Sequence, residues 1–285
     1  MTKCILSVDI EDWYHISGLP NTPQLPEWDR FPSRIEANFR KLLDIFSTKK
    51  AKATCFFLGW VAEKYPHLVK EALQRGHEIA SHGYSHKLAY EMSERDFLLD
   101  VRKAKDILEA ISGVNVLGYR APGFSVTEDT PWFFDKLIEA GYEYDSSVFP
   151  APRVFGGIKT DKFAPHVIRR NSKEITEFPV TAIKILGKPY CCFGGGYLRL
   201  APYFLIRRLS RDVLAQNRPV IFYIHPREID PAQPRLKMSL HRKFNTYVNL
   251  NTTMSKITNI CGHFDVTTFS DYIKAYPFNA QSEGI

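Results

Sequence analysis

The residues with the clearest capacity for chemistry are two histidines four positions apart. His82 and His86 are separated by Gly83, Tyr84 and Ser85. On a helical turn, side chains at this spacing share one face, with β-carbons about 5–6 Å apart, so both imidazoles can bind one ion. Histidine pairs also occur by chance in polar loops. A metal site therefore needs a third ligand from elsewhere in the chain.

Carboxylates follow the first apolar run of the chain. Residues 4–8 are apolar and partly β-branched, and the run stops at Asp9, Glu11 and Asp12. This pattern is typical of a buried strand that delivers acidic groups at its end. Other strand-like runs also end at polar groups, which are His82, Arg120, Asp145 and His225.

Short strand-like runs and helical apolar patterns alternate along the chain. The predicted strands are residues 4–8, 53–58, 78–80, 116–119, 142–144, 175–180, 219–224 and 264–267. The predicted helices lie at 35–46, 61–74, 93–113, 130–140, 202–216 and 252–260, whereas 150–170 reads as an irregular excursion. Such alternation predicts parallel βαβ units with functional residues at the carboxyl ends of the strands. Asp9, His82, Arg120 and Asp145 are thus expected on one rim.

Composition indicates a single globular domain spanning residues 1–285. The chain is 44% hydrophobic and 13% aromatic, with a net charge of +7 and five cysteines, an odd number that does not suggest a disulfide framework. No apolar signal segment precedes the first acidic residues, and no uncharged run reaches the ~18 residues of a membrane span. We therefore expect a cytoplasmic protein without a nucleic-acid partner. Its modest basic excess is compatible with acidic glycans, phosphates or peripheral membrane contact.

Four motifs resemble, in order, those of the polysaccharide deacetylases with the NodB-homology fold. They are Val-Asp-Ile-Glu-Asp at 8–12, His-Gly-Tyr-Ser-His at 82–86, Arg-Ala-Pro-Gly at 120–123 and Ile-His-Pro at 224–226. The paired histidines look most like the branch with peptidoglycan deacetylases and allantoinase-like proteins. Residues 194–203 and 225–235 look like the deacetylases encoded beside bacterial exopolysaccharide and exosortase loci. The resemblance extends from about residue 5 to about residue 273.

The resemblance implies an α/β fold, namely a distorted (β/α) barrel of about seven parallel strands. It also implies a divalent metal, usually Zn2+, held by His82, His86 and one carboxylate. Three protein ligands leave a position for water, and the ion lowers the pKa of that water toward about 7. The family motif has two aspartates where this chain has three acidic residues. With Asp9 as the base, the carboxylate ligand would be Asp12, which residue type favours, or Glu11, which spacing favours, and we expect Asp12.

The same resemblance assigns roles in hydrolysis of an N-acetyl group. Asp9 would be the base that takes a proton from water, and Arg120 would orient Asp9 through a charge-assisted pair. His225 would protonate the leaving amine. Asp145 or Glu177 would set the tautomer of His225.

Substrate contacts are expected from the loops around these groups. Pro122 and Gly123 follow the motif arginine, and a backbone N–H near Gly123 would stabilise the oxyanion together with the metal. Tyr84 and Tyr197 would offer aromatic surface to a sugar.

The predicted function is a metal-dependent N-deacetylase that acts on a bacterial surface polysaccharide, such as an exopolysaccharide or O-antigen, or on its cytoplasmic precursor. One alternative is a deacylase or cyclic-amide hydrolase acting on another C–N bond. The other is a catalytically silent glycan-binding module. The joint presence of Asp9, His82, His86, Arg120 and His225 favours catalysis.

Overall fold

The computed structural model of the chain describes residues 3–19, 22–151, 156–170 and 172–277. The strands are β1 (Cys4–Ile10), β2 (Thr54–Phe57), β3 (Glu78–Ser81), β4 (Gly118–Tyr119), β5 (Tyr144–Asp145), β6 (His166–Arg170), β7 (Lys173–Glu177), β8 (Ile183–Ile185), β9 (Lys188–Tyr190), β10 (Val220–Ile224) and β11 (Val266–Thr267). The helices are α1 (Ile35–Lys49), α2 (Gly59–Lys64), α3 (Pro66–Gln74), α4 (Glu94–Ser112), α5 (Phe133–Glu139), α6 (Gly195–Leu200), α7 (Tyr203–Leu214), α8 (Leu240–Tyr247), α9 (Leu250–His263) and α10 (Phe269–Ala275).

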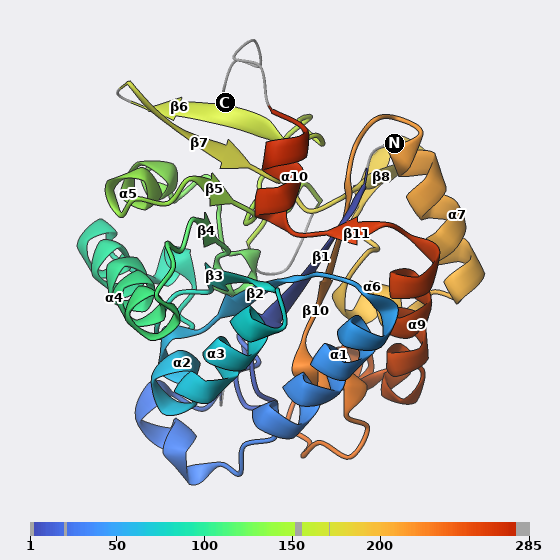
Figure 1. Cartoon of the computed structure of the whole chain (residues 1–285), viewed down its shortest axis with the longest axis horizontal. Coiled ribbons are helices and arrows are strands. Elements are labelled where there is room, and N and C mark those ends of the chain that lie inside the picture. Colours follow the sequence, from blue (N-terminus) through green and yellow to red (C-terminus); the bar gives the residue numbers. More distant parts are fainter. Residues whose placement is uncertain (1–2, 20–21, 152–155, 171, 278–285) are drawn as a thin grey trace.

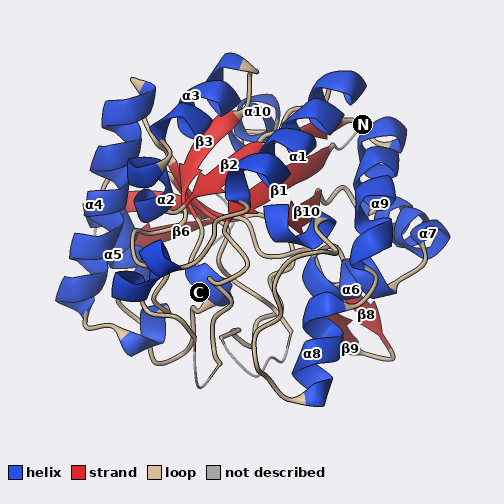
Figure 2. Cartoon of the chain, turned by 90° about the horizontal axis from the view of Figure 1, so that it is seen from below, coloured by secondary structure: helices blue, strands red, loops and turns tan. Residues whose placement is uncertain are grey.

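One large sheet organises the molecule, in the order β10-β1-β2-β3-β4-β5-β7-β6, with β11 paired to the start of β1. Neighbours from β10 to β7 are parallel, and only β6 runs antiparallel to its partner. The sheet curls into a half-barrel with helices packed around it (Figures 1 and 2). This architecture confirms the predicted α/β barrel-like fold.

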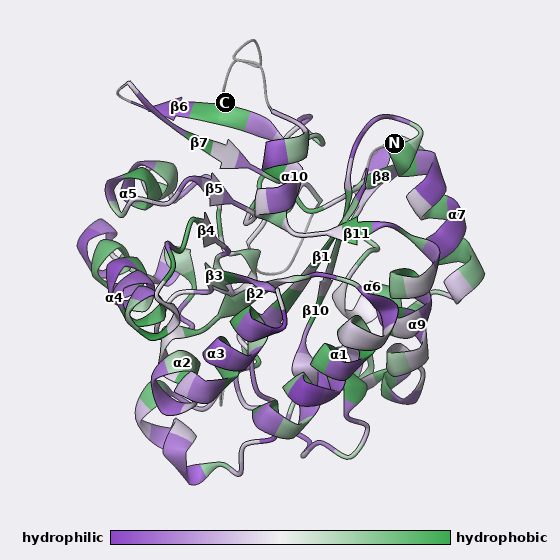
Figure 3. Ribbon diagram, in the orientation of Figure 1, coloured by the Kyte–Doolittle hydropathy of each residue, from purple (hydrophilic) through white to green (hydrophobic). Residues whose placement is uncertain are grey.

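Burial explains why the central strands are apolar throughout. Every residue of β1 and of β10 is buried, as expected for parallel strands covered on both faces. The surrounding helices are amphipathic, and in Figure 3 they alternate between hydrophobic and hydrophilic stripes. In α1, for example, Phe39, Leu42 and Phe46 are buried, whereas Lys41 and Asp44 are exposed.

The register of β1 and β10 joins the two ends of the chain. Val8 pairs with Ile224, so the next residues, Asp9 and His225, leave adjacent strands at the same level. Asp9 in turn pairs with Phe56 of β2 on the other side. The sheet therefore positions the first acidic motif between the strands that lead to the other motifs.

Several local predictions differ from the structure. The single helix predicted at 61–74 is two helices, α2 and α3, because Pro66 begins a new helix after the break at Tyr65. The excursion predicted at 150–170 contains the antiparallel strand β6, although its residues 152–155 lie outside the described part. Helices α8 and α10 and the hairpin β8–β9 were not predicted. None of the described helices has the length and hydropathy needed to cross a membrane.

Candidate functional site

Three buried side chains converge on one point at the carboxyl end of the sheet. Nε2 of His82 and Nε2 of His86 each lie 3.0 Å from the same oxygen, Oε1 of Glu11. All three residues are buried, and they form one of two groups of potential metal-binding side chains among the described residues. The second group consists of Asp9, Glu11 and His225.

A tight turn, not a helix, brings the two histidines together. Gly83 and His86 both have left-handed backbone angles, with φ of +72° and +55°. Asp100 of α4 holds the turn, because its carboxylate accepts hydrogen bonds from the backbone N–H groups of Tyr84 and Ser85 at 2.8 and 3.1 Å. The helical turn expected from the spacing is therefore wrong, although the two rings still face one point.

The hydrogen bonds of His82 indicate what kind of ligand Glu11, His82 and His86 could bind. Its Nδ1 lies 2.8 Å from the carbonyl oxygen of Arg120, which can only accept, so Nδ1 carries the proton. In the neutral ring Nε2 then has a lone pair aimed at the Glu11 carboxylate. At 3.0 Å these two atoms must share a positive charge between them, either a proton or a metal ion. A carboxylate and two imidazoles whose other nitrogens are hydrogen-bonded form a donor set that fits a divalent metal ion.

The second histidine is anchored in a similar way. Nδ1 of His86 lies 3.2 Å from Oγ of Ser17. Burial favours the neutral carboxyl of Glu11, but the neighbouring charges of His86 and His225 outweigh burial and hold the pKa of Glu11 well below its usual value. Glu11 is therefore an anion suited to bind a cation.

Asp12, the carboxylate ligand that residue type favoured, lies elsewhere. Its Oδ2 accepts hydrogen bonds from Ser33 Oγ at 2.6 Å and from the backbone N–H groups of Arg34 and Ile35 at 2.9 and 3.2 Å. These groups form the start of α1, where free N–H groups attract an anion. The structure thus brings Glu11, and not Asp12, to the two histidines.

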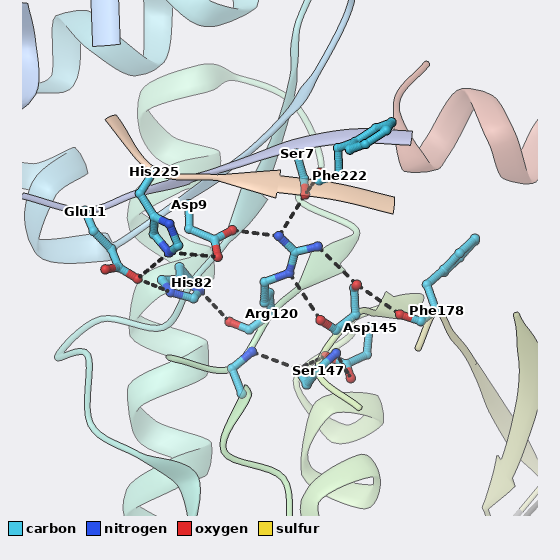
Figure 4. Close-up of polar contacts among 12 residues, drawn as sticks. Ser7, Asp9, Glu11, His82, Arg120, Asp145, Ser147, Phe178, Phe222 and His225 are labelled. Carbon is cyan, nitrogen blue, oxygen red and sulfur yellow. Dashed lines mark hydrogen bonds and ion pairs between the residues drawn. The ribbon is translucent and has the colours of Figure 1, made fainter. Parts of the chain in front are cut away.

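A buried ion pair fixes Asp9 beside this cluster. Arg120 donates from Nη1 to Asp9 Oδ1 at 2.7 Å and to Ser7 Oγ at 2.8 Å, as Figure 4 shows. Its other nitrogens donate to the carbonyl oxygen and the hydroxyl of Ser146. Arg120 is fully buried, and its guanidinium also lies 4.2 Å from the ring centroid of Phe56. This network holds Asp9 in one orientation.

His225 faces two of the three acidic residues of the first motif, Asp9 and Glu11. Its Nε2 lies 3.7 Å from Asp9 Oδ2 and 3.8 Å from Glu11 Oε1 (Figure 4). The other ring nitrogen, Nδ1, lies 3.5 Å from Glu228 Oε1. Burial alone would lower the pKa of His225, but the charges of Glu11 and Glu228 outweigh it and raise this pKa above its usual value. The partner of His225 is therefore Glu228, and neither Asp145 nor Glu177 as predicted.

Glu228 is itself held by a buried arginine. Arg199 of α6 pairs with the Glu228 carboxylate, and both side chains are at most 2% exposed. Burial raises the pKa of Glu228, but the charges of Arg199 and His225 outweigh it and lower this pKa to about 2. Glu228 stands only three residues after His225, so its spacing is a signal that sequence reasoning could have used.

Asp145 belongs to a separate buried network. Its carboxylate accepts hydrogen bonds from the hydroxyl and the backbone N–H of Ser147, and that hydroxyl accepts one from the N–H of Ala121. Glu177 lies against Asp145 and accepts from the N–H of Val148. Burial raises the pKa of Asp145 to about 6. Asp145 thus supports the loop that follows Arg120 rather than contacting His225.

The predicted substrate contacts fall in different environments. The Tyr84 hydroxyl donates to Glu63 of α2, and Lys103 of α4 lies 3.4 Å above the Tyr84 ring, so this ring packs between two outer helices. Tyr197 on α6 is 60% exposed and available to a ligand. Pro122 is buried, and Gly123 has φ of +62° in the turn after the motif arginine.

Comparison with protein families divides the chain into two segments. Residues 27–144 match the family described as polysaccharide deacetylase, and residues 146–274 match a domain of unknown function, DUF3473. His82, His86 and Arg120 lie in the first segment, whereas His225 and Glu228 lie in the second. The candidate site therefore combines residues from both segments with Asp9 and Glu11, which precede the first.

Curated relatives match part of the chain. A peptidoglycan-N-acetylglucosamine deacetylase from Bacillus cereus is 34% identical over 89 residues, which are 31% of this chain and 32% of that protein. A peptidoglycan deacetylase from Helicobacter pylori is 30% identical over 116 residues, 40% of this chain and 38% of that protein. The chain thus matches about a third of the length of these relatives.

Solved structures match nearly the whole chain. A candidate polysaccharide deacetylase from Mycobacterium smegmatis superposes with a TM-score of 0.65 at 18% identity, covering 96% of this chain and 90% of that chain. The PuuE allantoinase superposes with a TM-score of 0.63 at 15% identity, covering 97% of this chain and 91% of that chain. At such low identity these matches establish the fold.

Proposed function

We propose that the chain is a metal-dependent hydrolase that removes N-acetyl groups from a glycan, and the match of residues 27–144 to the polysaccharide deacetylase family supports this proposal. The observation that carries this proposal is the convergence of Glu11, His82 and His86 on one point, with Asp9 and His225 beside it. A glycan-binding module would have no need to bury five such groups beside one another.

The three converging residues would hold the ion, most often Zn2+ in sites with this donor set. A bound divalent ion would supply Lewis-acid polarisation of the amide carbonyl and of the attacking water. The hydrogen bonds from His82 to the Arg120 carbonyl and from His86 to Ser17 orient the two rings toward it.

Asp9 and His225 would move the protons. Oδ1 of Asp9 is engaged by Arg120, which leaves Oδ2 to accept a proton from water as a general base. His225 lies 3.7 Å from that oxygen and would donate from Nε2 to the departing amine. Glu228 at Nδ1 favours the doubly protonated ring that this donation needs.

The relatives and the motifs together support a proposal for the substrate class. The curated relatives are named for deacetylation of peptidoglycan, whereas residues 194–203 and 225–235 resemble deacetylases of exopolysaccharide loci. We propose an N-acetylated bacterial surface polysaccharide, such as exopolysaccharide or O-antigen, or its precursor, as the substrate.

Acetate release from chitin oligosaccharides and from N-acetylated exopolysaccharide fragments would test the proposal. We expect release by the zinc-loaded protein and at most a trace by Glu11→Gln and His225→Ala variants. Formate release and ring opening of allantoin should be measured in the same samples. Activity on one of those substrates without acetate release, or no acetate release at all by folded, metal-loaded protein, would overturn the assignment.

A further inference from the structure

Two stretches of the chain contain no acidic residue. Residues 178–211 and 231–264 lack both Asp and Glu, and they carry many of the basic side chains of the second half of the protein. These basic residues are Lys184, Lys188, Arg199, Arg207, Arg208, Arg211, Arg235, Lys237, Arg242, Lys243 and Lys256. Helices α6 and α8, together with the first residues of α7, come from these stretches.

The same helices expose large apolar side chains. On α6 and the start of α7, Tyr197 is 60% exposed, Leu200 50% and Phe204 75%. On α8, Leu240 is 85% exposed and Phe244 53%. Single exposed apolar residues are ordinary, but a group on packed neighbouring elements marks an interaction surface. We call these five residues, with the exposed Lys237 and Lys243, the α6–α8 surface.

Buried polar contacts hold this surface together. Arg199 of α6 donates to the carbonyl oxygens of Asn245, Thr246 and Val248 at the end of α8. Lys256 of α9 donates to carbonyl oxygens of α6 and of the connection to α7. Figure 2 shows α6 and α8 on the same side of the molecule. The apolar side chains therefore project from a fixed platform.

The α6–α8 surface borders the candidate metal site. Arg242 of α8 donates to the carbonyl oxygen of Ser17, whose hydroxyl lies 3.2 Å from His86 Nδ1. A partner seated on this surface would thus lie close to the segment that contacts His86.

We propose that the α6–α8 surface docks onto an anionic lipid bilayer. Exposed Phe, Tyr and Leu side chains insert at the level of the headgroups, and the lysines beside them meet lipid phosphates. A soluble polyanion would satisfy the lysines but would leave the apolar side chains in water. A second copy of this chain would bring two basic surfaces together, so lipid complements this surface best. The inference does not depend on the proposed reaction.

Sedimentation with vesicles tests the docking directly. Full-length protein would be mixed with phosphatidylcholine vesicles with or without phosphatidylglycerol, at low and high salt. One variant combines Phe204→Ser, Leu240→Ser and Phe244→Ser, and a second combines Lys237→Glu and Lys243→Glu. Their matched controls are Leu99→Ser on α4, where the side chain is 55% exposed, and Lys70→Glu on α3.

We expect the wild type and both controls to sediment only with the anionic vesicles, and each surface variant to lose at least about tenfold in affinity. Thermal unfolding would verify that the variants fold, and if the apolar variant does not, the charge variant carries the test. Wild-type protein that stays in solution, or surface variants that bind as the wild type does, would overturn the proposal. The proposal would also be overturned if the protein bound heparin more tightly than anionic vesicles and if the apolar substitutions left heparin binding unchanged. Acetate release from a soluble oligosaccharide, measured separately, distinguishes failure of docking from failure of the catalytic assignment.

Discussion

Arg120 donates a 2.7 Å hydrogen bond to Asp9, and neither side chain is more than 2% exposed. The pair is fully surrounded by protein, with Ser7 and Ser146 taking the remaining donors of the guanidinium. Removing one partner would leave an uncompensated buried charge on the other.

Arg120→Met should therefore damage both stability and catalysis. We expect a loss of about 3–5 kcal/mol in the free energy of unfolding, typical of a broken buried pair. Urea unfolding would measure it, and Arg102→Met, which removes a surface pair with Glu139, should cost at most about 1 kcal/mol. If Arg120→Met does not fold, Arg120→Lys should fold but lose activity, because one ammonium cannot serve Asp9, Ser7 and Ser146 together. Equal losses for Arg120→Met and Arg102→Met would contradict this account.

Substitutions of Glu11 and of Asp12 should have different effects on zinc affinity, which a zinc-binding titration would measure. Glu11→Gln should weaken zinc binding by at least about 100-fold, beyond the 10–100-fold typical of residues that only support a ligand. Asp12→Ala should leave zinc affinity nearly unchanged but cost roughly 1–3 kcal/mol of stability, because the buried N–H groups of Arg34 and Ile35 lose their acceptor. Weaker zinc binding in Asp12→Ala than in Glu11→Gln would reverse the assignment.

Zinc itself should stabilise the fold. A ligand that binds only the folded state adds about 2.7 kcal/mol at a free concentration 100 times its Kd. After dialysis against a chelator, the wild type should regain a higher Tm when zinc is added, as calorimetry would record. His82→Ala removes a ligand and should show no such rise. A rise of the same size in both proteins would place the zinc elsewhere.

Glu228 should act through His225 as a positioning residue. Glu228→Gln should lower kcat by roughly 10–100-fold, a fraction of the 100–10,000-fold supplied by a general acid, while KM and zinc affinity stay the same. Steady-state kinetics of Glu228→Gln, His225→Ala and the double variant form a cycle. We expect the double variant to be no slower than His225→Ala alone. If the reductions in kcat of the two single variants multiplied in the double variant, Glu228 would act in a step that does not involve His225.

The Asp145–Glu177 pair should make stability depend on pH. Burial raises the pKa of both carboxyls, of Asp145 to about 6, and the Asp145 charge raises that of Glu177 further. The folded state then holds more protons than the unfolded one, so the free energy of unfolding falls as pH rises from about 4 through the folded-state pKa values. Glu177→Gln should remove part of this fall, by about 1.4 kcal/mol for each pKa unit removed. Urea unfolding from pH 4.5 to 7.5 would show this change, and Glu174→Gln, exposed on the same strand, should keep the wild-type slope.

Sequence reasoning predicted the sheet and most of the residues that lie together at the candidate site, because both have local signals. The strand that ends at Asp9 and the strand that ends at His225 are apolar runs followed at once by polar residues. For the choice between Glu11 and Asp12 the local signals disagreed, because spacing favoured Glu11 and residue type favoured Asp12. The outcome depends on the start of α1. There the backbone N–H of Arg34, 22 residues after Asp12, donates a hydrogen bond to the Asp12 carboxylate, and Glu11 is the residue that faces the histidines.

Other errors arose where spacing was interpreted without the backbone. The spacing of His82 and His86 suggested a helical turn. The actual turn has positive φ at Gly83 and His86 and is held by the Asp100 carboxylate, but it still directs both imidazoles to one point. Asp145 and Glu177 stand at strand ends, which suggested contact with His225. In the sheet, however, β1 to β4 lie between β10, which leads to His225, and the strands β5 and β7, which end at Asp145 and Glu177. Strand order is a tertiary property that no local pattern encodes.

The pairing of β1 with β10 also has a consequence during synthesis. Val8 leaves the ribosome before its partner Ile224, which follows more than two hundred residues later. Until then one edge of β1, every residue of which is buried in the finished fold, has no neighbour, and such edges recruit other chains. We therefore expect nascent chains that stop before β10 to aggregate or to occupy chaperones, and completion of the sheet to be a late event in folding.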